Sequence, residues 1–373
     1  MNNRRCFIDI HAIQTIPPSC VNRDDTGAPK SCNYGGVPRA RVSSQCWKRA
    51  AREKFPAEML GIRTLKVPVM VRDRIMALCE QDGQLMSEDA AAKLATAVLK
   101  SAGVVKEKKG KKDPKATAPT SNPATEEVLD KLDAAMFLSG VQLDALARQA
   151  IKDPRDKKAA EAALSDGVTA DIAMFGRMVA ANPKLNVDAC VQVAHAISTH
   201  VVHTEYDYFT AVDEGNRSDE TGAGHVNTAE FNSATLYRYA CVDASGLAKI
   251  LGDEAVVAAM TFVRCFLTSM PDGKSNSFAN FTAPGYIKIC VRSDGPLSFA
   301  GAFEAPVRNP EGGFFDKSVE TLEAYAADLE SKYGRKPVLD VGFSDGSLDE
   351  VLSKVETTIS AEVPDGADGG GVA

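Results

Sequence analysis

The chain has 373 residues, of which 44% are hydrophobic and 25% charged, the proportions of a soluble protein large enough for more than one compact lobe. No apolar stretch is long enough to span a bilayer, and Asp9 and His11 interrupt the N-terminal apolar run, so a membrane protein and a signal peptide are not expected. Nine scattered cysteines without a C-x-x-C pair indicate reduced thiols in a cytoplasmic protein rather than a cysteine-based zinc site.

The chain begins with an alternating segment, residues 6–16, that predicts a β-strand. The stretch that follows, residues 21–55, contains eight basic and three acidic residues, a net charge of +5, whereas the whole chain carries −7. Positive charge is therefore gathered in one place on an acidic protein. This concentration predicts a surface that binds a polyanion.

The second half of the basic stretch is predicted to be a helix that begins at Ser43 or Ser44, two good N-cap residues. On a 3.6-residue period, four of its side chains share one face: Gln45, Lys48, Arg49 and Arg52. Before the helix, Gly35-Gly36 favours close approach of backbone to a ligand, and a short predicted strand carries Arg39 and Arg41. A helix start and a cationic stripe both suit phosphate oxygens. The alternative is a solvated amphipathic helix with no ligand.

Helical patterns fill residues 56–163, interrupted at 101–126 by a lysine-rich and then proline-, threonine- and alanine-rich segment that predicts a flexible insertion. Residues 168–180 are predicted to form an extended strand or hairpin. Residues 186–202 are predicted to form an apolar helix or a mixed helix and strand.

Residues 204–229 form a polar excursion with six acidic residues and one basic residue, so it is not expected to lie along phosphates. Two strands, 230–242 and 285–291, enclose a predicted buried helix at 246–270, and the tail 364–373 is predicted to be disordered. The pattern predicts an α+β fold with inserted lobes. The order of elements is consistent with a ferredoxin-like or RRM-like core.

Catalytic and metal-binding patterns are weak. The spacing of His195, His200 and His203 does not place all three on one helical face, so packing is favoured over zinc. Asp24 and Asp25 could act as paired carboxylates, but a turn that positions Arg23 is the favoured interpretation. No nucleophile elbow or phosphate-binding P-loop motif is present, and no cofactor is predicted.

The tyrosines at 237 and 239 are expected to pack in the core rather than to stack on bases. With no aromatic platform on the predicted sheet, binding through the phosphate backbone is favoured. Phosphate contacts position a nucleic acid without reading its sequence.

Six segments occur in an order that resembles a known family. They are PSCVNRDD (18–25), GGVPRARVSSQCWKRAAR (35–52), DIAMFGRM (171–178), AHAISTH (194–200), DYFTAVDE (207–214) and EFNSATLYRY (230–239). Together they resemble CasC, the family of backbone subunits of the type I-E CRISPR Cascade surveillance complex. The resemblance spans most of residues 1–305.

The resemblance implies an RRM-like palm with an inserted helical finger lobe and a thumb-like β-hairpin. The palm would comprise residues 1–55 and 164–363, with the thumb at about 204–229, and the finger lobe would comprise 56–163. The family members hold CRISPR RNA (crRNA) and are not enzymes.

The family's guide-binding positions fall on eight residues here: Arg23, Lys30, Arg41, Ser43, Gln45, Lys48, Arg49 and Arg52. The resemblance also implies an apolar wedge that splays a nucleotide at regular intervals, formed by Met178 and Val226.

The implied partners are the crRNA, further copies of the chain in a head-to-tail helical filament, target DNA paired with the guide, and the other Cascade subunits, in antiviral defence. Those subunits are the large, small, 5′-end capping and repeat-processing ones. No membrane partner is implied. Two alternatives stay open: a guide-dependent ribonuclease that uses Asp24 or Asp25, as in type III effectors, and a filament scaffold that binds no nucleic acid.

Overall fold

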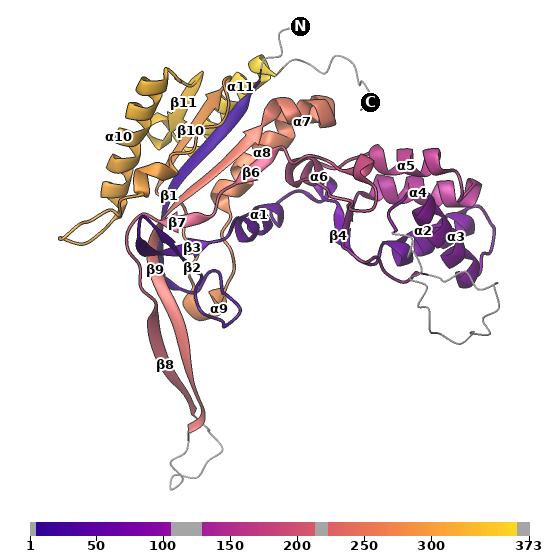
Figure 1. Cartoon of the computed structure of the whole chain (residues 1–373), viewed down its shortest axis with the longest axis horizontal. Coiled ribbons are helices and arrows are strands. Elements are labelled where there is room, and N and C mark those ends of the chain that lie inside the picture. Colours follow the sequence, from indigo (N-terminus) through magenta and orange to yellow (C-terminus); the bar gives the residue numbers. More distant parts are fainter. Residues whose placement is uncertain (1–4, 106–128, 213–222, 364–373) are drawn as a thin grey trace, which may run out of the picture. The chain divides into compact units, whose positions relative to one another are not determined.

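The computed structural model describes residues 5–105, 129–212 and 223–363. The chain divides into two compact units (Figure 1): residues 1–55 together with 191–373, here called the sheet unit, and residues 56–190, here called the helical unit. Residues 164–190, which were expected in the palm, are part of the helical unit.

Among the described residues, nine strands of the sheet unit form one sheet in which every pairing is antiparallel. The main order is β11-β10-β1-β9-β7-β3-β2, and β6 and β8 also pair with β9. The strands are β1 (Phe7–Ser19), β2 (Ser31–Tyr34), β3 (Val37–Val42), β6 (Val191–Val193), β7 (Ala196–Ser198), β8 (Glu205–Val212), β9 (Ala223–Asp243), β10 (Tyr286–Arg292) and β11 (Leu339–Gly342). The strands predicted at 6–16, 230–242 and 285–291 are therefore confirmed.

The helices of the sheet unit are α1 (Ser44–Arg52), α7 (Ala244–Leu251), α8 (Ala255–Thr268), α9 (Ser275–Phe278), α10 (Phe315–Tyr333) and α11 (Leu348–Glu362). The single helix predicted at 246–270 is in fact two, because Gly252 adopts a φ of +56° and ends α7. Residues 186–202, predicted as a helix or a mixed element, contain β6 and β7 and no α-helix.

Both faces of the central strand β1 are buried, because successive side chains point to opposite faces. On one face, Phe7 and Ile13 pack with Tyr237 and Tyr239 in a core that α10 covers. The predicted core role of these tyrosines is confirmed. On the other face, α1 contacts α8. With both faces covered, the central strands offer no open platform for stacking bases.

A buried ion pair fastens β1 to β10. Arg292 Nε lies 3.0 Å from Asp9 Oδ2, and both side chains are fully buried. The second oxygen of Asp9 accepts from the hydroxyl of Tyr239 at 2.7 Å, and the Leu297 N–H also donates to Asp9 at 2.9 Å. Arg292 pairs in addition with Glu330 of α10. Every polar atom of Asp9 is thus bonded, as a buried carboxylate requires.

The helical unit contains α2 (Val67–Gln81), α3 (Glu88–Ser101), α4 (Gly140–Lys152), α5 (Lys157–Ser165) and α6 (Ala170–Phe175). A small two-stranded sheet, β4 (Ile62–Thr64) and β5 (Met136–Leu138), was not predicted. Short 3₁₀ turns occur at Ala57–Met59, Pro183–Leu185, Gly252–Glu254, Ala300–Phe303 and Phe343–Asp345. The predicted insertion at 101–126 lies mostly outside the described residues, as does the tail 364–373.

The strand or hairpin predicted at 168–180 is wrong for its first part, which forms α6. The buried Asp171 carboxylate accepts from the Gly61 N–H at 2.9 Å and ties α6 to the start of the helical unit. Arg177 then points inward and donates to the Leu164 carbonyl and to Gln142 at 2.7 and 3.0 Å. These contacts explain why this segment belongs to the helical unit.

No helix among the described residues is both long enough and apolar enough to cross a membrane.

Candidate nucleic-acid interface

The basic stretch begins with an ordered loop that presents Arg23. Asp24 Oδ1 accepts from the N–H groups of Thr26 and Ala28 at 2.9 and 3.1 Å. Arg23 itself forms an isolated β-bridge with Pro29 and its side chain is exposed. Hydrogen bonds hold the pKa of Asp24 below its usual range, and the bond from the Thr26 hydroxyl has the largest effect. Asp24 therefore acts as a turn residue beside Arg23, the interpretation that the sequence analysis favoured.

The glycine pair shapes a tight turn rather than an approach to a ligand. Gly35 and Gly36 have φ values of +60° and +76° and connect β2 to β3, a geometry that favours glycine at both positions. A Cβ atom on Gly35 would lie 1.7 Å from the Glu304 carbonyl oxygen. The pair therefore lets the β2–β3 hairpin pack against the backbone at Glu304.

The two arginines of β3 have different roles. Arg39 is fully buried and donates to the carbonyl oxygens of Ser198 and Phe303 at 2.8 and 2.9 Å. Arg41 remains partly exposed, with Nε 3.2 Å from the Ser31 carbonyl oxygen and Nη1 3.2 Å from His195 Nδ1. Arg41, and not Arg39, is available to an external anion.

Helix α1 begins as predicted, with Ser43 as its N-cap. The Ser43 hydroxyl accepts from the Cys46 N–H at 3.3 Å, and the Ser43 N–H donates to Asn22 Oδ1 at 2.9 Å. The residue is only 7% exposed. Ser43 thus orients the start of the helix. The next two N–H groups, those of Ser44 and Gln45, have no acceptor within the helix.

The polar face of α1 forms the predicted stripe. Trp47, Ala50 and Ala51 are buried on the opposite side. Of the stripe residues, Gln45 and Arg49 are exposed, and Lys48 and Arg52 are half-buried. Arg49 pairs with Glu53 of the next turn at 2.7 Å, which offsets part of its charge. Burial lowers the pKa of the half-buried Lys48.

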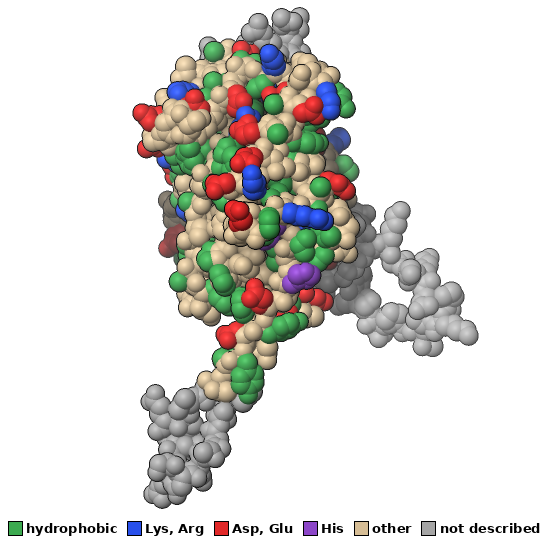
Figure 2. Space-filling view, turned by 90° about the vertical axis from the view of Figure 1, so that its left-hand side faces the viewer, with side chains coloured by type: hydrophobic (Ala, Val, Ile, Leu, Met, Phe, Trp, Pro, Cys, Tyr) green, Lys and Arg blue, Asp and Glu red, His purple; other side chains and the backbone are tan. Residues whose placement is uncertain are grey.

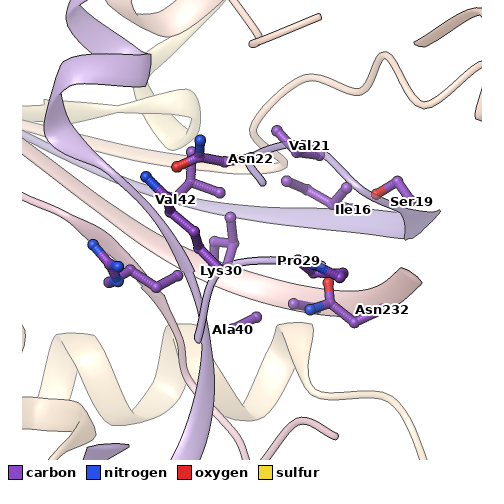
Figure 3. A pocket seen from close by; sticks show the side chains of 12 residues that line it. Ile16, Ser19, Val21, Asn22, Pro29, Lys30, Ala40, Val42 and Asn232 are labelled. Atoms are coloured by element: carbon purple, nitrogen blue, oxygen red, sulfur yellow. The ribbon is translucent and has the colours of Figure 1, made fainter. Parts of the chain in front are cut away.

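Lys30 lies at a hollow of about 20 Å³ between the basic loop, β3 and β9 (Figure 3), roughly the space of one water molecule. Its N–H donates to the Asn22 carbonyl at 2.8 Å, and its carbonyl accepts from the Arg41 N–H at 3.0 Å. Lys30 is thereby joined to the N-cap region and to β3. The loop, β3 and α1 follow one another in the chain, and together we call them the basic track. They carry Arg23, Lys30, Arg41, Ser43, Gln45, Lys48, Arg49 and Arg52.

Acidic residues gather on another part of the sheet unit. Figure 2 shows acidic side chains along the face of the sheet unit that carries α10, where exposed acids include Asp316, Glu320 and Asp328. The basic track is therefore a local feature and not part of a uniformly basic surface.

The two predicted wedge residues lie in different units. Met178 belongs to the helical unit and is 81% exposed, which excludes a core role for its side chain within this chain. Val226 pairs with Thr210 in the hairpin formed by β8 and the first half of β9, the hairpin expected at 204–229. The hairpin tip, 213–222, and the side chain of Val226 lie outside the described part of the structure.

Three features of this region were not predicted from the sequence. Tyr206 and Tyr208 are 69% and 68% exposed on one side of β8, although the analysis assigned no role to the aromatic residues of this segment. Lys274 lies near the track. Its positive charge lowers the pKa of Cys20, against the larger effect of burial, and a Cβ atom on neighbouring Gly273 would be 2.1 Å from the Val21 carbonyl oxygen. His195, for which only metal binding and packing were considered, contacts Arg41. Only proximity in the fold reveals the last two.

The histidines are used separately. His200 is buried, stacks on Phe314 with ring centres 3.8 Å apart, and accepts from the Thr235 N–H at 3.1 Å through Nε2. The described residues contain no cluster of three or more histidine, cysteine or acidic residues able to hold a metal ion. The packing role favoured for His200 is thus confirmed.

Fold and site together define an α+β protein with a cationic loop, strand and helix on its surface. The chain belongs to the CT1975-like protein family, whose model matches residues 8–363. Comparison with curated proteins gives no match.

Two solved structures are similar to nearly the whole chain. A subunit described as "CRISPR RNA-guided surveillance complex, pre-nicking" is 30% identical with a TM-score of 0.75, over 95% of this chain and 100% of that one. Another, described as "CRISPR RNA-guided surveillance complex", is 26% identical with a TM-score of 0.66, over 95% and 99%. These matches support the assignment of this chain as a Cascade-type Cas protein.

Proposed function

We propose that the protein is a non-catalytic backbone subunit of a CRISPR Cascade complex, of the CasC type found in type I-E systems. Several copies assemble head to tail along the crRNA, hold its phosphates with the basic track and display the spacer for pairing with target DNA. The observation that carries this proposal is the clustering of exposed and half-exposed cations along one loop, strand and helix of an acidic protein.

The sheet supports the same mode of binding. The order β10-β1-β9-β6 is all antiparallel, with α1 between β1 and β6 in the chain and α7 and α8 between β9 and β10. This is the order of a β-α-β-β-α-β unit, and on this ground we assign an RRM-like palm, with the β8–β9 hairpin as its thumb and the helical unit as its finger. Because α10 covers the sheet face that RRM domains use for stacking, recognition through phosphates fits better than recognition through bases.

The similar chains belong to complexes described as RNA-guided, which makes a guide RNA and other complex subunits the natural partners of this chain. Target DNA would meet the protein as a guide–DNA heteroduplex. A subunit that repeats along a guide needs a head-to-tail interface that does not close into a ring. Met178 and Val226 are proposed as the apolar wedge between successive nucleotides.

The ribonuclease alternative gains no support from Asp24, because its carboxylate already serves the Thr26 and Ala28 N–H groups. The scaffold alternative leaves the local excess of cations without a role. We therefore propose RNA binding without catalysis.

Lys48→Ala is expected to weaken RNA binding and to reduce the slope of log affinity against log salt by about 0.7, the value for one phosphate on a single strand. Binding of unrelated RNA sequences should weaken equally, because a phosphate contact does not read bases. The measurement is a salt titration of the affinity for a labelled single-stranded RNA.

Lys54→Ala is the matched control. Lys54 follows α1 directly but donates its ammonium to the Thr268 carbonyl at 2.6 Å, away from the stripe. The control variant removes the same charge and should keep the wild-type slope. A Lys48→Ala protein with an unchanged salt slope would contradict the proposed function of the stripe.

A further inference from the structure

His195 is placed to act on the basic track through Arg41. It lies between β6 and β7, next to Ala196, which pairs with Val42 of β3. The Arg41 guanidinium is held at two points, by the Ser31 carbonyl oxygen at Nε and by His195 Nδ1 at Nη1, both at 3.2 Å. These two contacts fix the direction of a long side chain that would otherwise sample many rotamers.

The contact with Arg41 determines the protonation state of His195. A guanidinium is always a donor and never an acceptor, so Nδ1 must be the acceptor and must carry no proton. The single proton of the neutral ring therefore sits on Nε2. Burial, together with the charges of Arg41 and Lys30, lowers the pKa of His195, which agrees with a neutral ring at pH 7.

The Nε2–H group is left as an unused donor. Among the residues that the structure describes, Nε2 of His195 has no hydrogen-bond partner, and the side chain is exposed at the surface beside Arg41. A neutral N–H donor next to a fixed guanidinium matches two oxygens of one phosphodiester, or a phosphate oxygen and an adjacent ribose hydroxyl.

We propose that His195 is a further guide-binding residue, which orients Arg41 through Nδ1 and donates from Nε2–H to a backbone oxygen of the bound RNA. The inference rests on the proposed function, since it assigns a role within the same track. It gives the track a contact that adds no charge. His195 thus differs from the cations around it in a measurable way.

The difference appears in the salt dependence. Only neutralised phosphates release counterions, so removing a neutral donor lowers affinity at every salt concentration without changing the slope. His195→Ala is expected to weaken binding of a single-stranded RNA about three- to tenfold, the usual range for one hydrogen bond, with the wild-type slope. Lys48→Ala, measured alongside, should change the slope.

Two further variants distinguish the hydrogen bonds of the His195 side chain from the effect of its size. His195→Asn retains an acceptor and a donor at nearby positions and should recover most of the lost affinity, whereas His195→Phe should not. In an Arg41→Ala background, His195→Ala should cost less than in the wild type, because its share in orienting Arg41 is already gone. The thermal unfolding midpoint of each variant, compared with that of the wild type, checks that the fold is intact.

Unchanged affinity in His195→Ala while Lys48→Ala loses binding would overturn this inference and leave the proposed function in place. Full additivity of the His195 and Arg41 substitutions would overturn the orienting role. A wild-type protein that binds no RNA, alone or within the assembled complex, would instead overturn the proposed function itself.

Discussion

Replacing Arg41, Lys48 and Arg52 together by alanine is expected to lower the affinity for single-stranded RNA by about 100- to 1000-fold. A hydrogen bond to a charged group contributes about 1.5 kcal/mol at the lower end of its range, so three fully additive contacts would give slightly more than a thousandfold, and neighbouring contacts in one network are usually less than additive. The salt slope should fall by about 2, because three phosphates lose their partners at about 0.7 each. Neither the fold nor its thermal midpoint should change greatly, since none of these three side chains is fully buried.

The control for this triple variant removes three cations elsewhere. Lys249, Lys332 and Lys354 are basic residues of α7, α10 and α11, outside the basic track. Their joint replacement by alanine gives the same net charge as the triple variant. If both proteins lost affinity equally, binding would follow net charge alone and the basic track would have no special role.

Asp9→Ala is expected to destabilise the protein by about 3 to 5 kcal/mol. The substitution removes the partner of the fully buried Arg292 on β1 and leaves only Glu330 of α10 to balance its charge, and breaking a buried ion pair is strongly destabilising. The Tyr239 hydroxyl and the Leu297 N–H lose their acceptor as well. Denaturant unfolding followed by circular dichroism measures the change.

Asp294→Ala supplies the comparison. Asp294 also pairs with an arginine, Arg335, but its side chain is 39% exposed, so water can replace the lost contact. A loss of at most about 1 kcal/mol is expected for such a pair. Equal losses from the two substitutions would mean that burial of the Asp9–Arg292 pair does not determine its importance.

Local sequence signals were sufficient for the basic helix. Serine at the N-cap, a four-residue polar stripe and an opposite face of tryptophan and alanine specify the start and the orientation of α1, and the structure has both. The strands β1, β9 and β10 were predictable for the same reason, since strong alternation or apolar runs mark them.

Residue type and spacing did not separate Arg39 from Arg41. Both lie on β3 two residues apart, and both are arginines, yet the carbonyl oxygens of Ser198 and Phe303 bind one of them in the interior. Those acceptors lie about 160 and 264 residues further along the chain. Burial of an arginine on distant backbone carbonyls is a tertiary property, which local sequence does not encode.

The segment at 168–180 shows the same limit. Its apolar run is too short to tell a strand from a buried helix by periodicity. The Asp171–Gly61 hydrogen bond and the inward position of Arg177 are tertiary contacts that place this segment in the helical unit, with its first part as α6. The His195–Arg41 contact likewise joins residues 154 positions apart, so the sequence suggested only a histidine cluster.

The most direct test of the central claim is the length of RNA that the assembled protein protects. The chain is co-expressed with a repeat–spacer array and the partner subunits, purified, treated with ribonuclease, and the protected RNA is sized. We expect fragments whose lengths form a ladder of constant spacing, one step for each subunit along the guide, and loss of that ladder in the Arg41, Lys48 and Arg52 triple variant. An assembly that survives ribonuclease intact while protecting no RNA would contradict the account and would favour a scaffold without nucleic acid.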